Sequence, residues 1–267
     1  MRLRPPWTVR LLAIAVLLQG CGGAHARKQS YQFDSATNAC RHQPASCAQA
    51  AGQEAVLPSA VRTFATAGGS AVAAVKLLDA TSKQEVTKAL EECANKARTQ
   101  VILERFGGRI PTPDECRKPI GPDARAITLA MQLGEEMHRI ALQCAAERLQ
   151  DLRPGGFSIE PTYRYDRSTD TTRWVTQEEI ELLRRQGNLG ELKGTLIPDV
   201  VLHSGNPVQA QAVFDFKFPC VDLTQHGRWR EYPPGHPFAG IRQDVMYKQA
   251  LKVRWIAQVA PWIGASP

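Results

Sequence analysis

The chain has 267 residues, of which 43% are hydrophobic and 22% are charged, and its formal net charge is +7 at pH 7. This composition excludes a wholly disordered chain, because it holds enough apolar side chain for one large core or two smaller ones. The mild basic excess is compatible with a nucleic-acid partner but does not indicate one.

The first residues have the pattern of an export signal. Three arginines precede an apolar run from Leu11 to Leu18, which is too short to cross a bilayer. The run ends in Leu-Gln-Gly-Cys21, which resembles the bacterial lipoprotein box. The resemblance implies that residues 1–20 are a signal peptide and that Cys21 is acylated, anchoring an exported protein to a membrane, most simply the outer membrane. The alternative is an ordinary export signal with a chance cysteine.

The cysteines are compatible with disulfides. Six remain after Cys21, an even number on the exported side of a membrane, where disulfides form. Their spacing leaves the pairing open, and no C-x-x-C pair exists, so a thiolate zinc site is not expected. They are Cys40, Cys47, Cys93, Cys116, Cys144 and Cys220.

Composition predicts three regions in the exported chain. Residues 21–53 are rich in Gly, Ala, Ser and Gln and are predicted to be a lipidated linker. Residues 54–105 have helical spacing and are predicted to form a small helical delivery or N-terminal region. Within it, residues 63–75 are uncharged but too few to span a bilayer, which favours a buried helix over membrane insertion. Residues 106–267 are predicted to form the main domain.

The main domain shows helical and strand patterns in turn. After a connector rich in Gly and Pro, the patterns predict a long helix from about Ala124 to Leu152, a hairpin around the sequence DRSTD, and a short helix from Gln177 to Arg185. Two apolar strands within Ile197–Cys220 and a last helix from about Gly240 to Leu251 follow. This order predicts an α/β (α+β) fold.

Two aspartates and a lysine stand in segments that otherwise have the composition of buried strands: Asp199, Asp215 and Lys217. A buried carboxylate is costly unless it is paired or bound to a metal. A divalent cation between two carboxylates removes their repulsion, and Mg²⁺ prefers oxygen ligands. Because side chains alternate along a strand, Asp215 and Lys217 are expected on one face and the three neighbouring phenylalanines on the other. The pattern predicts a metal site.

The pattern Pro198-Asp199 followed by Asp215-Phe216-Lys217 resembles the PD-(D/E)xK nuclease superfamily. Its RecB-like members add a G-x-x-x-H element before it, matched by Gly134 to His138, and a Q-x-x-x-Y element after it, matched by Gln243 to Tyr247. Each added pair is spaced i, i+4 and so lies on one helical face. The resemblance implies a restriction-endonuclease-like core, a mixed sheet flanked by helices, and hydrolysis of phosphodiester bonds.

The resemblance also implies a ligand set. Asp199 and Asp215 would bind the metal, with the backbone carbonyl of Phe216 and the imidazole of His138 as further ligands. The metal would be Mg²⁺, with Mn²⁺ as an alternative. The alternative to His138 is an acidic neighbour on the helix, Glu135 or Glu136, as in superfamily members that are not RecB-like.

Three further residues have implied catalytic roles. Lys217 would orient the attacking water or stabilise charge on the phosphate. Gln243 and Tyr247 would steady the substrate backbone or the lysine. In the long loop before the last helix, residues 228–230 have two equally supported interpretations. They contact phosphate and stack on a base, or their aromatic residue packs on the core. His226 and His236 in the same loop match no metal motif.

Export combined with a nuclease site suggests a role against other cells. The combination resembles polymorphic bacterial toxins, in particular lipoprotein toxins exchanged between outer membranes. That resemblance implies nucleic acid as the target in a neighbour's cytoplasm, with DNA favoured and RNA left open, and a cognate immunity protein. One alternative is a surface nuclease for environmental DNA. Another is a non-enzymatic envelope binding module with a degenerate nuclease fold.

Overall fold

A computed structural model of the chain describes residues 78–120, 127–224 and 227–267. The predicted signal peptide, Cys21, the linker and residues 54–77 of the predicted helical region lie outside these ranges. Judged by length and hydropathy, no helix within the described ranges qualifies as a membrane span.

A mixed sheet of five strands lies at the centre of the fold, in the order β3-β6-β7-β8-β9. Strands β7 and β8 are parallel, whereas the other neighbours are antiparallel. The parallel pair is connected through helix α7, as a crossover requires. The predicted α+β class is confirmed. The elements are β3 (Phe157–Ile159), β6 (Val200–His203), β7 (Ala210–Phe216), α7 (Gln243–Leu251), β8 (Trp255–Ala260) and β9 (Gly264–Ser266).

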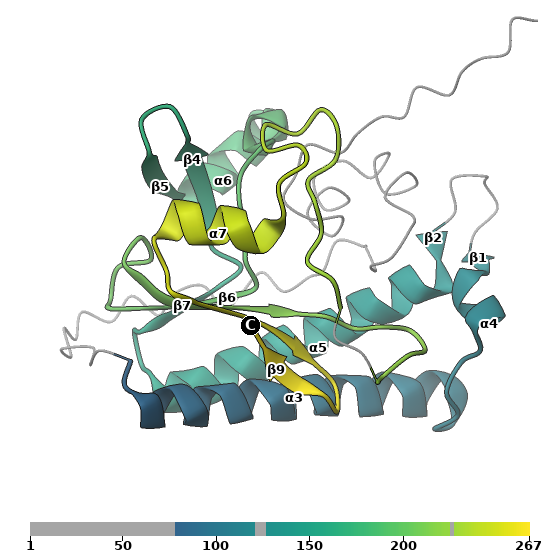
Figure 1. Cartoon of the computed structure of the whole chain (residues 1–267). Coiled ribbons are helices and arrows are strands. Elements are labelled where there is room, and N and C mark those ends of the chain that lie inside the picture. The colour runs from purple at the N-terminus through teal and green to yellow at the C-terminus, as the bar shows by residue number, and fades with distance from the viewer. Residues whose placement is uncertain (1–77, 121–126, 225–226) are drawn as a thin grey trace, which may run out of the picture.

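Two long helices, α3 (Ala80–Phe106) and α5 (Leu129–Leu152), cover one face of the sheet (Figure 1). Both begin where a side chain caps the first turn, Asp79 in α3 and Thr128 in α5. Apolar residues of both helices share one core with alternate residues of β6 and β7, such as Val200 and Phe214. A disulfide between Cys93 and Cys144 joins the two helices.

The shared core corrects the predicted boundary between residues 105 and 106. Residues 80–105 were expected to lie in a separate helical region, yet α3 packs in the same core as the sheet of the main domain. Helical periodicity shows that a helix has an apolar face but does not show what covers it. The described residues from α3 onwards therefore belong to one folded body.

The opposite face of the sheet carries α7, and beyond it a second sheet and a short helix (Figure 1). Strands β4 (Thr162–Asp166) and β5 (Thr171–Val175) form the hairpin that was predicted around DRSTD, and α6 (Gln177–Arg185) has the predicted bounds. A short 3₁₀ helix, Leu189–Leu192, follows α6 and packs against it. The residues of β6 and β7 whose side chains point to this face, such as Val213, build a second core.

The connector after α3 contains three short elements. Thr112 caps α4 (Pro113–Arg117), and β1 (Pro119–Ile120) pairs with β2 (Ile127–Thr128) ahead of α5. A disulfide between Cys116 and Cys220 joins α4 to the segment just after β7. The sequence left the cysteine pairing open, and Cys40 and Cys47 lie outside the described residues.

Candidate functional site

Strand register brings the two aspartates together. Val200 of β6 is opposite Phe214 of β7, so Asp199, one step before Val200, comes opposite Asp215. Phe214 and Phe216 belong to the core under α3 and α5, and Phe218 packs against that core. The expected division of β7 into an aromatic face and a polar face is confirmed.

Asp215 and Lys217 form an ion pair on the polar face of β7. The ammonium of Lys217 contacts Oδ2 of Asp215, and 7% and 6% of the two side chains are exposed. The backbone N–H of Lys217 donates to the carbonyl of Val259 at 2.9 Å, which continues the pairing with β8 past the end of β7. A buried pair of this kind needs close mutual contact, because both charges have lost their hydration.

Asp199 connects three elements of the fold. Its Oδ2 accepts a hydrogen bond from the backbone N–H of Phe216 at 2.6 Å and lies 2.8 Å from Nε2 of His138 on α5. The ring of His138 also packs edge-on against Phe216 and Phe218. Helix α5 and strands β6 and β7 therefore meet at this carboxylate, which is 7% exposed.

The environment of His138 favours its charged form. Burial lowers the pKa of His138, but the charge and hydrogen bond of Asp199, with the charges of Glu160 and Glu135, outweigh it and raise the pKa to about 9. The metal-free protein therefore carries an imidazolium at neutral pH. Since a ligating imidazole must be neutral, a metal ion bound there would displace a proton.

The two glutamates that were considered in place of His138 lie in different surroundings. Glu135 is buried, at 6% exposure, and its charge acts on His138. Glu136 faces the neighbouring helix, where its carboxylate pairs with Arg105 of α3. Glu135 is therefore near the site, whereas Glu136 is engaged at the contact between two helices.

Helix α7 places Gln243 and Tyr247 on the same side of the sheet as Lys217. Both are buried, and the ring of Tyr247 packs edge-on against Trp229, with 6.2 Å between ring centroids. The ammonium of Lys217 lies 5.5 Å from the centroid of the Trp229 ring. Tyr247 of the predicted Q-x-x-x-Y element thus connects to the lysine through Trp229.

In the loop between Lys217 and α7, some side chains pack on the core and others are exposed. Trp229 packs against the core on this face, as the packing alternative expected, yet it also faces Lys217, while Arg228 is exposed. His236 stacks on Tyr232 at 4.2 Å, and burial lowers its pKa to about 4. His236 is thus neutral at pH 7 and packs on Tyr232, and His226 lies outside the described residues.

Sequence reasoning missed Gln258 of β8. It stands in register with Asp215 on the neighbouring parallel strand and is 2% exposed. A Cβ added to Gly227 would come within 3.3 Å of Lys217 Cβ and 3.4 Å of Gln258 Oε1, so both side chains lie beneath this glycine. The available signal was a polar residue inside an apolar strand, the same signal that drew attention to Asp215.

The donor atoms of the site are of the type that Mg²⁺ prefers, but they are not arranged around a common point. Carboxylates and a backbone carbonyl are the hard oxygen donors that Mg²⁺ prefers. Within the described residues, however, no three His, Cys, Asp or Glu side chains are grouped to hold a metal ion. Asp199 contacts His138, and Asp215 contacts Lys217. A metal ion would have to replace these cationic partners beside the carboxylates.

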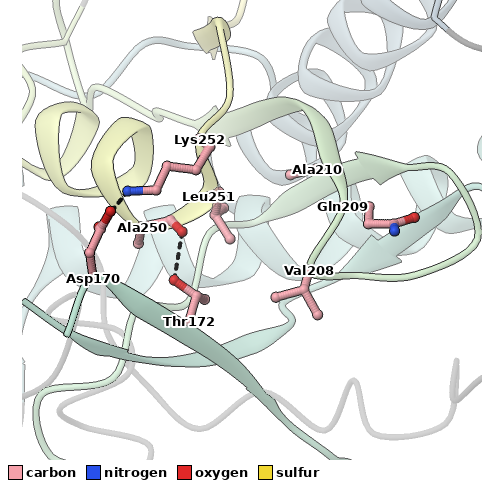
Figure 2. A pocket seen from close by; sticks show the side chains of 8 residues that line it. All are labelled: Asp170, Thr172, Val208, Gln209, Ala210, Ala250, Leu251 and Lys252. Carbon is pink, nitrogen blue, oxygen red and sulfur yellow. Dashed lines mark hydrogen bonds and ion pairs between the residues drawn. The ribbon is translucent and has the colours of Figure 1, made fainter.

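A pocket of about 360 Å³ lies elsewhere, at the C-terminal end of α7 (Figure 2). In it, Lys252 pairs with Asp170, and the hydroxyl of Thr172 donates to the carbonyl of Ala250 at 2.6 Å. None of the residues predicted for catalysis lines this pocket. It is therefore separate from the cluster around Asp215.

No family model matches the chain. No curated protein and no solved structure matches it either.

Proposed function

We propose that the protein is a metal-dependent nuclease whose active site is the cluster around Asp199, Asp215 and Lys217. The observation that carries the proposal is the buried pair of Asp215 and Lys217 on the polar face of β7, with Asp199 held beside it just before β6. Burying charges in adjacent strands costs stability, and such a cost is commonly retained where the charges serve a function. Catalysis by a carboxylate-bound cation is such a function.

The order of elements supports a RecB-like assignment within the PD-(D/E)xK superfamily. Helix α5 carries His138, β6 follows Asp199, β7 carries Asp215, and α7 carries Gln243 and Tyr247. A mixed sheet with helices on both faces agrees with a restriction-endonuclease-like core. This assignment rests on four motifs in one order and on the contacts between their residues.

The residues of the cluster divide into metal-binding and substrate-binding roles. Asp199, Asp215 and the carbonyl of Phe216 would hold Mg²⁺ or Mn²⁺, with His138 or Glu135 as a further ligand. When bound, the ion would activate water and neutralise charge on the phosphate. Released from Asp215, the ammonium of Lys217 would orient that water or stabilise the charge that develops on the phosphate.

The side chains of α7 support the lysine. Tyr247 contacts Trp229, whose ring faces the ammonium of Lys217. Gln243 is held at the start of α7, where its backbone N–H donates to the carbonyl of Arg230 at 2.8 Å. Trp229 in turn would stack on a base, and the exposed Arg228 would contact a backbone phosphate.

The proposed biological role is that of a lipoprotein toxin passed to neighbouring cells. It combines the predicted acylation of Cys21 with the proposed nuclease site, and it implies a cognate immunity protein in protected cells. Cytoplasmic expression of the chain without residues 1–20 is expected to arrest growth, and Asp215→Asn is expected to abolish the arrest. Harmless expression of a chain that cuts DNA in vitro would remove the toxin role and leave the nuclease.

A second candidate is a non-enzymatic binding module of the envelope. The observation that favours it is the pairing of both aspartates with cationic side chains, Asp199 with His138 and Asp215 with Lys217. In a binding module these pairs would be structural. Substitution of Asp215 would then change the stability of the protein and nothing else.

The experiment that tests the proposal is nucleic-acid cleavage by the full chain purified in detergent. Plasmid DNA and bulk RNA are incubated with Mg²⁺, with Mn²⁺ or with a chelator. We expect cleavage of DNA that depends on the metal and is lost in Lys217→Met, which keeps the length of the side chain without its charge. Folded protein that cuts neither nucleic acid with either metal, oxidised or reduced, would favour the binding module.

A further inference from the structure

We infer that Gln258 is a substrate-binding residue of the same site and that its amide donates a hydrogen bond to a phosphate oxygen of the nucleic acid. This inference rests on the proposed nuclease function. It adds a residue that belongs to none of the four motifs.

The position of Gln258 is fixed by the sheet. Strands β7 and β8 are parallel, with Asp215 in register with Gln258, and side chains in register on neighbouring strands point to the same face. The neighbouring residues of β8, Ala257 and Val259, point into the core under α3 and α5. Gln258 therefore lies on the face that carries Asp215 and Lys217.

The amide of Gln258 is buried, but its nitrogen and oxygen make no hydrogen bonds within the described residues. Neither Oε1 nor Nε2 has a hydrogen-bond partner among the described residues, although the residue is 2% exposed. Leaving a buried donor or acceptor unpaired destabilises a protein, and most buried side-chain amides are paired. An apolar residue of similar size would fit this strand without that cost. We therefore expect the amide to hydrogen-bond a bound ligand.

The chemistry of the amide selects the partner. A glutamate here would have the same shape and would supply another carboxylate next to Asp215 for the cation, but its charge would repel a phosphate. A glutamine instead offers two N–H donors without adding negative charge. Beside Lys217, which faces the same glycine, Gly227, these donors suit a phosphate oxygen.

The test compares three variants of the full chain: Gln258→Leu, Gln258→Glu and, as a matched control, Gln211→Leu. Gln211 is in β7, away from the site, and its Oε1 accepts a hydrogen bond from Arg153 at 2.9 Å. Thermal melting is measured without metal or DNA. Cleavage of DNA is measured in Mg²⁺, and binding of a labelled DNA duplex is measured in Ca²⁺.

For Gln258→Leu we expect a Tm about 2–4 °C above wild type, because an unpaired buried amide is removed. We also expect a loss of about tenfold or more in both DNA affinity and kcat/KM. Gln258→Glu is expected to bind DNA more weakly still, because of charge repulsion. Gln211→Leu is expected to melt below wild type and to cut DNA at the wild-type rate.

Three results would overturn the inference. A lower Tm for Gln258→Leu would make the glutamine structural, and unchanged DNA binding and cleavage would place it outside the site. A Gln258→Glu variant that binds DNA as well as wild type, or cuts it faster, would assign the side chain to the cation instead of the phosphate. Wild-type protein that neither binds nor cuts nucleic acid is a different failure, since it removes the proposed function itself.

Discussion

Nε2 of His138 lies 2.8 Å from Oδ2 of Asp199, which joins helix α5 to the start of strand β6. Because Asp199 is 7% exposed, removal of the imidazole leaves a buried carboxylate without its cationic partner. We expect His138→Ala to lower the free energy of unfolding by about 3–5 kcal/mol in metal-free protein. Urea unfolding at pH 7 measures the loss.

The matched control for this pair is Asp199→Asn, alone and combined with His138→Ala. Loss of the carboxylate removes the charge that raises the pKa of His138, so an NMR titration of Asp199→Asn is expected to give a pKa below about 9. The double variant is expected to be more stable than the sum of the single losses predicts. Additive losses would mean that the two side chains do not interact in solution.

Arg98 fixes the segment that follows Lys217. Its guanidinium donates to the carbonyl of Pro219 at 2.7 Å and to that of Cys220 at 3.3 Å. We expect Arg98→Ala to cost about 2–3 kcal/mol in unfolding free energy, because two carbonyls lose a charged donor. Arg98→Lys keeps the charge but not the two-pronged geometry. Guanidinium chloride unfolding of both variants is the measurement. If Arg98→Lys is as stable as wild type, the two hydrogen bonds of the guanidinium do not stabilise this segment.

The disulfide between Cys93 and Cys144 closes a loop with a sequence separation of 51 residues. Chain entropy predicts that a loop of this length stabilises the folded protein by about 4 kcal/mol. We expect the double variant Cys93→Ala and Cys144→Ala to lose most of that amount in urea unfolding, with its overall helix content unchanged by circular dichroism. A midpoint equal to that of the oxidised wild type would show that the bond is absent in solution.

His203 provides a pH-dependent contribution to stability. Burial lowers its pKa to about 4, whereas an unfolded histidine titrates near 6.5. The unfolded chain therefore takes up a proton first as pH falls. The contribution of His203 to stability is present above pH of about 6.5, is lost progressively as pH falls to about 4, and amounts to about 3 kcal/mol at most.

The variant His203→Asn tests this contribution. The Nδ1 atom of His203 accepts a hydrogen bond from the N–H of Gly205 at 3.1 Å, and an asparagine oxygen can replace it. Nε2 of the same ring lies 3.0 Å from Oγ of Ser158. Urea unfolding from pH 4 to 7 is expected to show a flatter profile in the variant. An unchanged profile would assign the dependence to other groups, His236 first.

Local patterns predicted several elements well. The hairpin around DRSTD and the helix Gln177–Arg185 were predictable because turn residues and caps act within a few positions of the chain. Alternation along β7 likewise predicted that Asp215 and Lys217 share a face. The long helix begins at Leu129 and not near Ala124, where Thr128 supplies the cap.

Relations across the chain were less predictable. The packing of α3 on the sheet was missed, because an apolar helical face does not identify its partner. The pairing of Cys116 with Cys220 depends on where α4 lies after folding, which spacing does not encode. Gln258 was missed because a single glutamine matches no motif, although its place between apolar neighbours in β8 was visible in the sequence.

The most direct measurement is single-turnover cleavage of plasmid DNA in Mg²⁺ by wild type, Asp215→Asn and Asp170→Asn. Asp170 also pairs with a lysine, Lys252, but at the separate pocket of Figure 2. A metal site at Asp215 predicts that Asp215→Asn cuts about a hundredfold more slowly or worse, while Asp170→Asn cuts at the wild-type rate. Equal cleavage rates for the two variants would contradict an active site at Asp215.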